Sequence, residues 1–306
     1  MTTVDTYTTG RVAAPRGRVR WNRPLLWLTA ASAVLAVVAA VGIVADDRIL
    51  TGVPIWLKPF KFAVSFAVYS WTLAWMLALL PRRSRPAEWS GIIIVGVAVV
   101  ELAIIVTQVA RGTTSHYNVA TPLDAILWSA MGTSIMVLFF AQLVIGVATL
   151  RQRIPDRVAA YAIRLGLAIS LLGMGLAFLM TAQVTDAGTV GAHSVGVADG
   201  GPGMPITGWS TTGGDLRISH FVGLHALQAL PLLAYAMGRW TGWLPRVRAR
   251  LMLILGCAYA VLVLLLTWQA LRAQPLLRPD GITLAALAAL VAVTTVASIA
   301  TVKRTT

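Results

Sequence analysis

Ten charged or imidazole side chains lie within or directly beside the long apolar runs of this chain. Charge in the hydrocarbon core of a bilayer is costly, so such groups usually mark a functional site. Carboxylates and imidazoles exchange protons and ligate metals, whereas lysine and arginine bind anions. The ten residues are Lys58, Lys61, Glu101, Arg111, His116, Asp124, Asp215, Arg217, His220 and His225.

The first group of these residues shares one helical face. Glu101, Gln108 and Arg111 are spaced so that all three lie along one side of a helix. Glu101 is ~13 Å from the expected helix end at Ala110, at 1.5 Å per residue. A carboxylate at that depth must be paired, hydrated or protonated. Glu101 is therefore a candidate general base, metal ligand or proton-binding group, and a structural hydrogen bond to a neighbouring helix is the alternative.

The next helix is expected to begin with Thr121 as the N-cap and Pro122 in the first turn. Asp124 then lies in that first turn, where it is either a second catalytic carboxylate or a stabiliser of the helix N-terminus. The preceding loop is polar for its length. Its candidates for binding an anionic or hydroxylated head group are Arg111, His116, Tyr117 and Asn118. The alternative is that these residues tie a tight loop to its neighbours.

A second cluster opens a later helix. His225 lies ~12 Å beyond Arg217 along the helix, at the depth of Glu101, so a Glu101–His225 contact is possible if their helices are neighbours. Such a pair could bind a metal, relay a proton or simply satisfy each other. His220 and His225 are five residues apart and lack the i, i+4 spacing of a helical metal-binding pair. Gln228 follows one turn deeper.

A metal ion is a candidate cofactor, with His116, His220 and His225 as its candidate ligands. Haem is less favoured, because a membrane b-type haem takes a histidine from each of two facing helices, whereas His220 and His225 share one helix. Catalytic roles are assigned to Glu101, His225 and Asp124. Substrate binding is assigned to Lys58, Lys61, Gln108, Arg111, Tyr117, Asn118, Arg217 and Gln228.

Membrane-spanning helices must position these residues. The chain is 58% hydrophobic and 12% charged, whereas soluble domains carry about 25% charged residues. Eight apolar runs reach the ~20 residues that cross a bilayer. We therefore expect an all-α polytopic transmembrane bundle with spans at 25–45, 58–80, 90–110, 122–150, 158–182, 217–238, 249–271 and 281–302.

The distribution of basic residues predicts the orientation of the bundle. Seventeen of the 25 lysines and arginines lie on one side if both termini are cytoplasmic, as the positive-inside rule requires in a bacterial-type inner membrane. We expect a disordered basic cytoplasmic tail over 1–23, a transmembrane domain over 24–302 and a short cytoplasmic tail over 303–306. The first span is interpreted as an uncleaved helix rather than a signal peptide.

The outer loop 184–215 is rich in Gly, Ser and Thr, so it is either flexible or a lid over the helices. His193 within it is interpreted as a solvated residue. The single cysteine, Cys257, lies in an apolar run and is interpreted as a small buried packing residue.

Two classes of function fit the pattern. The first is a metal- or acid/base-dependent membrane enzyme, or a cofactor-binding protein, acting on an amphiphilic substrate from the outer leaflet. The alternative is a transporter or binding protein for an anionic small molecule, disfavoured because no polar track crosses the inner half. A structural membrane subunit is a third interpretation. Nucleic acid is excluded as a partner, because the basic residues lie in short loops that contact lipid.

Overall fold

The computed structural model describes residues 20–183 and 189–303. Eight helices in these ranges are long and apolar enough to cross a membrane, which confirms the all-α polytopic bundle. They are α1 (Arg23–Ala45), α2 (Leu57–Ala78), α3 (Arg85–Arg111), α4 (Pro122–Leu150), α5 (Arg157–Leu176) with its short extension α6 (Phe178–Thr181), α7 (Leu216–Trp240), α8 (Pro245–Leu271) and α9 (Gly281–Lys303). The expected spans agree with these bounds to within five residues.

Several helices begin where the sequence provides a cap. The side chains of Asn22, Ser84, Thr121, Asp156 and Asp215 each accept a hydrogen bond from a backbone N–H of the first turn. Such caps satisfy donors that the helix itself leaves free. The predicted start of α4 at Thr121 and Pro122 is therefore confirmed.

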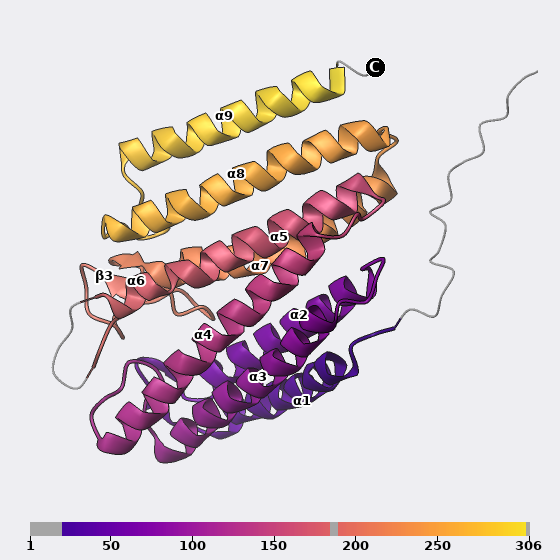
Figure 1. Cartoon of the computed structure of the whole chain (residues 1–306). Coiled ribbons are helices and arrows are strands. Elements are labelled where there is room, and N and C mark those ends of the chain that lie inside the picture. The colour runs from indigo at the N-terminus through magenta and orange to yellow at the C-terminus, as the bar shows by residue number, and fades with distance from the viewer. Residues whose placement is uncertain (1–19, 184–188, 304–306) are drawn as a thin grey trace, which may run out of the picture.

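The helices form two groups that α4 connects. Helices α1, α2 and α3 pack on one another, and so do α5, α7 and α8, with α9 outermost against α8. Helix α4 contacts α3 at one end and crosses to α5 at the other (Figure 1). One hydrophobic cluster, which includes Leu73, Ile94 and Leu167, joins the first group to α4 and α5. A second lies among α5, α7 and α8.

Helices α5 and α7 approach each other at two glycines. A Cβ atom on Gly173 would lie 2.7 Å from backbone atoms of Gly223 and Leu224, and a Cβ on Gly223 would lie 2.6 Å from Gly173. No larger side chain fits between these backbones. The pair allows the close contact that small residues give to membrane helices.

Loops gather at the end of the bundle where α1, α3, α5 and α8 finish; we call it the loop end (Figure 1). The hairpin β1 (Ile49–Leu50) and β2 (Val53–Pro54) lies here, and so does the antiparallel pair β3 (Ser194–Val195) and β4 (Gly214–Asp215). The described part of the 184–215 loop, which we call the cover, packs against α8: a Cβ on Gly214 would lie 1.9 Å from the carbonyl oxygen of Ala270.

Two sequence-based expectations need comment here. Cys257 is exposed on α8, so the prediction that it is buried is wrong. It lies on a face of α8 that no other described helix covers. The apolar residues around it are similar on all sides of the helix, so the sequence does not show which face packs against other helices. Most of the expected tail, residues 1–19, lies outside the described residues, as do 304–306.

Candidate functional site

Cations from α2 and α7 meet beneath the cover at the loop end. Lys58 lies within electrostatic range of Lys61, Glu101, Asp199 and Arg217. It is half-buried, and no hydrogen bond or ion pair joins it to any residue in the described ranges. An ammonium group that has lost much of its water without gaining a partner is costly. Lys58 is therefore a cation whose lost hydration no described side chain replaces.

The other two cations of this cluster are already engaged. Lys61 Nζ donates to the carbonyl oxygen of Thr207 at 3.0 Å. Arg217 donates to the carbonyl oxygen of Gly208 at 2.6 Å and forms an ion pair with Asp215, also at 2.6 Å. The Asp215 side chain is fully buried and accepts a further hydrogen bond from the N–H of Ser210. Lys61 and Arg217 thus hold the cover down on the helices.

Glu101 does not pair with His225. Its carboxylate accepts a hydrogen bond of 2.5 Å from the hydroxyl of Ser134 in α4, and it is only 1% exposed. The condition for a Glu101–His225 contact, neighbouring helices, is not met, because α3 packs chiefly on α4 and α2, whereas α7 packs chiefly on α5 and α8. The structural alternative, a hydrogen bond to a neighbouring helix, is present.

His225 and Gln228 form a separate polar chain that reaches α2. The ring Nδ1 of His225 lies 3.2 Å from the amide oxygen of Gln228, whose nitrogen donates to Thr72 of α2 at 3.3 Å. The ring of Phe221 covers His225 with a centroid distance of 4.3 Å. Since an amide oxygen only accepts, Nδ1 of His225 carries the proton and Nε2 is left as an acceptor.

His193 is not the solvated residue expected from the sequence. Its Nδ1 and its backbone N–H both bond Asp199, at 2.7 and 2.9 Å, and its ring packs edge-on against Tyr117 at 5.0 Å. Burial lowers the pKa of His193, although the hydrogen bond to Asp199 opposes this shift. Burial works to raise the pKa of Asp199, but hydrogen bonds from His193 and Ser194 outweigh it and hold this pKa below its usual range.

His116 is enclosed by aromatic rings. Phe62 of α2 and Trp128 of α4 lie 5.4 and 5.7 Å from its ring centroid, and Tyr117 follows it in the loop. Burial lowers the pKa of His116 well below its ordinary value, and the charge of Lys58 lowers it further. His116 is accordingly neutral at physiological pH. Burial also raises the pKa of Tyr117.

The histidines lie near one another without forming a metal site. His220 interacts electrostatically with both His193 and His225, and His116 does so with His193 and His220. Within the described ranges, however, no three His, Cys, Asp or Glu side chains are placed to hold a metal ion. The expected ligand set of His116, His220 and His225 is therefore not assembled. His220 instead donates from Nδ1 to the carbonyl oxygen of Gly173 at 2.8 Å.

Asp124 belongs to a clamp that closes the α3–α4 hairpin. One carboxylate oxygen accepts from Arg111 at 2.5 Å and from Gln108 at 2.9 Å, and the other accepts from Thr121 at 2.5 Å. Asn118 ties the same loop through Thr113 and Thr114. The sequence placed Asp124 in the first turn of α4 but did not predict its hydrogen bonds from Gln108 and Arg111, which position these side chains relative to one another.

The opposite half of the bundle contains polar groups that bond one another. Tyr69 donates to Gln142 at 2.6 Å, and Gln142 donates to Ser170 at 3.1 Å, linking α2, α4 and α5. Arg164 donates to the carbonyl oxygens of Thr149 and Gln152 at the end of α4. These side chains hold helices together.

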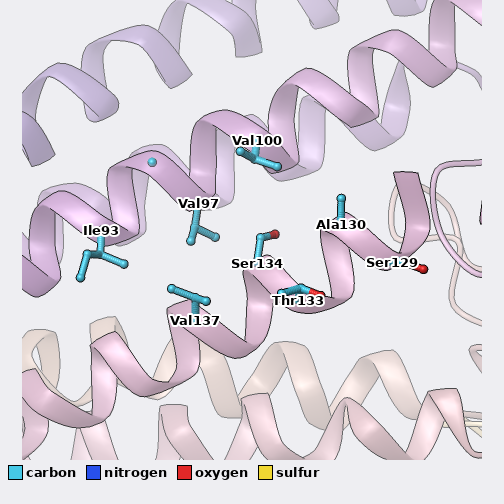
Figure 2. Close-up of a pocket in the computed structure, with 9 residues that line it drawn as sticks. Ile93, Val97, Val100, Ser129, Ala130, Thr133, Ser134 and Val137 are labelled. Atoms are coloured by element: carbon cyan, nitrogen blue, oxygen red, sulfur yellow. The ribbon is translucent and has the colours of Figure 1, made fainter. Parts of the chain in front are cut away.

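A groove of about 520 Å³ lies between α3 and α4, where the two helices diverge. Val97 and Val100 of α3 point toward Ala130 and Ser134 of α4 across it (Figure 2). The Ser134 hydroxyl that bonds Glu101 is thus part of the groove wall. Nothing in the sequence pattern predicted this groove, because its residues are ordinary membrane-helix residues.

These features define an integral, multi-pass membrane protein with a polar cluster at one end of its helices. No protein-family model, curated protein or solved structure matches this chain.

Proposed function

We propose that this membrane protein binds the anionic head group of an amphiphile at its loop end and performs acid–base chemistry on it. The observation that carries the proposal is the state of Lys58. Its half-buried ammonium group has Lys61 and Arg217 nearby and no direct partner among the described residues. An anionic group at Lys58 would give this ammonium group the direct partner that it lacks and would replace its lost hydration.

The neighbouring side chains suit distinct roles. Glu101 lies within electrostatic range of Lys58 and supplies a buried carboxyl for proton transfer. His220 and His225 each bond a carbonyl oxygen through Nδ1, which leaves Nε2 of each as a proton acceptor. The cover excludes water from the reacting group, and the Asp124 clamp positions Arg111 at its edge.

The alternative is a carrier for an anionic solute. A carrier needs a polar route through the bundle and a site near its middle. In the opposite half, Tyr69, Gln142 and Ser170 satisfy one another, which favours a site entered from the loop end. The orientation is inferred too: both termini in the cytoplasm of a cell whose plasma (inner) membrane holds the protein, with the loop end outside. The basic residues outside the loop end support it.

A thermal-shift titration tests the head-group site. Decyl phosphate is added to protein in a neutral detergent, with decanol as the uncharged comparison. A ligand that binds only the folded protein stabilises it by about 2.7 kcal/mol at a hundred times its Kd. We expect decyl phosphate, but not decanol, to raise the Tm of the wild type.

Two methionine variants complete the test. Lys58→Met should lose the rise in Tm, whereas Arg164→Met should keep it, because Arg164 is a half-buried cation whose hydrogen bonds are internal. The same rise in Lys58→Met as in the wild type would contradict the proposal.

A further inference from the structure

The groove between α3 and α4 opens toward the bilayer. Its walls belong to two membrane-spanning helices. Val100 and Val137, which line it, are 41% and 43% exposed. Within the hydrocarbon core, an open apolar surface of this kind contacts lipid chains rather than water.

Small residues keep the groove open. Gly96 and Ala130 line it, and a Cβ added to Gly96 would meet nothing within 4 Å. From Ile93 to Val100 the groove follows α3 for ~10 Å, at 1.5 Å per residue. This length and the apolar walls suit an extended hydrocarbon chain (Figure 2).

The groove leads to the polar cluster at one point. Ser134 lines it and donates to one oxygen of Glu101. The other oxygen of Glu101 has no hydrogen-bond partner in the described part of the chain, although the residue is 1% exposed. Lys58 interacts electrostatically with the same carboxyl. Glu101 thus connects the groove with the cationic site.

We infer that the α3–α4 groove is a lateral binding site for the hydrocarbon chain of a bilayer lipid, whose polar end reaches Glu101 and Lys58 past Ser134. The inference rests on the proposed function and names its substrate class: an anionic long-chain membrane lipid that enters sideways from the bilayer. A lipid bound in this way keeps its chain in hydrocarbon while its head group moves into the protein.

Photo-crosslinking tests the groove. The probes are phosphatidic acid and diacylglycerol, each with a diazirine in one acyl chain, in phosphatidylcholine vesicles containing the full-length protein. We expect phosphatidic acid to label 93–100 and 129–137 at least fivefold more than diacylglycerol does. Gly96→Phe should fill the groove and lower this labelling at least fivefold.

Gly132→Phe is the matched control. Gly132 is an exposed glycine of α4 whose added Cβ would also meet nothing, and it does not line the groove. Labelling in this variant should equal that of the wild type.

The contrary outcomes separate the two proposals. Labelling that falls in Gly96→Phe but is equal for both probes supports the groove and contradicts the anionic head-group site. A preference for phosphatidic acid that maps outside the groove, or persists in Gly96→Phe, overturns the groove alone. If Gly96→Phe converts a dimer into a monomer with unchanged lipid labelling, the groove is an interface between copies and the inference fails.

Discussion

Lys61 of α2 and Arg217 of α7 donate hydrogen bonds to consecutive carbonyl groups of one turn, those of Thr207 and Gly208. The two helices belong to different groups of the bundle and contact each other little directly. The turn therefore links the two groups of helices at the loop end. Ile206 in this turn has φ of 67°, a strained value for a β-branched residue. The hydrogen bonds from Lys61 and Arg217 stabilise the turn in this strained conformation.

Lys61→Met should loosen this turn. A hydrogen bond from a charged donor contributes about 1.5–3 kcal/mol, so exchange of the amide hydrogens of Thr207 and Gly208 should accelerate roughly ten- to a hundredfold. Hydrogen exchange followed by mass spectrometry measures it. Lys58→Met is the matched control, three residues away and without a hydrogen bond to the turn, and it should leave exchange unchanged. Equal exchange in wild type and Lys61→Met would show that the turn is held by other contacts.

Asp124→Asn should destabilise the protein without abolishing decyl phosphate binding. The substitution removes the charge that pairs with Arg111 and one acceptor of the clamp. We expect a loss of about 1–3 kcal/mol, because hydrogen bonds to charged groups are lost while Arg111 keeps access to solvent. Chemical denaturation in mild detergent measures the loss. A variant of normal stability that no longer binds decyl phosphate would instead place Asp124 in the ligand site.

The sequence was sufficient for the spans and for the cap that starts α4, and insufficient for the clamp and for the centre of the site. Helix capping depends only on residues close together in the sequence, so Thr121, Pro122 and Asp124 were enough to predict where α4 begins. The partners of Glu101 and His193 depend on which helices are neighbours and on how a Gly-rich loop folds back. Matching depths suggested His225 as the partner of Glu101, but depth constrains one coordinate only, and Ser134 on the adjacent α4 is the residue within reach.

Stability should fall as the pH drops below about 6.5. The pKa values of His116 and His193 are both lowered in the folded protein, so the unfolded chain takes up protons first. Their stabilising contribution is therefore complete above the unfolded pKa near 6.5 and is lost as the pH falls toward the folded values. Each group contributes a slope of at most about 1.4 kcal/mol per pH unit.

The measurement for this prediction is Tm between pH 8 and pH 5 for the wild type and His116→Phe. Phenylalanine keeps an aromatic ring beside Phe62 and Trp128 and cannot be protonated. The Tm of the variant should therefore depend less on pH than that of the wild type. A wild-type Tm that is constant over this range, or parallel curves for the two proteins, would contradict the prediction.

Gly223→Ala should separate α5 from α7 and lower the stability by more than 1 kcal/mol. The added Cβ would lie 2.6 Å from the Cα of Gly173. Because this atom belongs to the backbone of α5, the overlap can be relieved only if the two helices move apart. Gly132→Ala is the comparison. Its Cβ meets no atom within 4 Å, and alanine is favoured over glycine in a helix by about 0.5–1 kcal/mol, so this variant should be neutral or stabilised. Denaturation of both variants under one condition measures the difference.

The orientation can be tested with cysteines at exposed positions in a Cys257→Ser background, since Cys257 itself is exposed. Ala198 lies in the cover at the loop end, and Arg153 lies in the turn between α4 and α5 at the opposite end. If the termini are cytoplasmic, a membrane-impermeant maleimide should label Ala198→Cys in intact cells and Arg153→Cys only after permeabilisation. The reverse pattern would place the loop end in the cytoplasm, and the head-group site would then take its ligand from the inner leaflet. That outcome would also require the positively charged turns to lie outside, against the electrostatic preference that retains lysine and arginine in the cytoplasm during insertion.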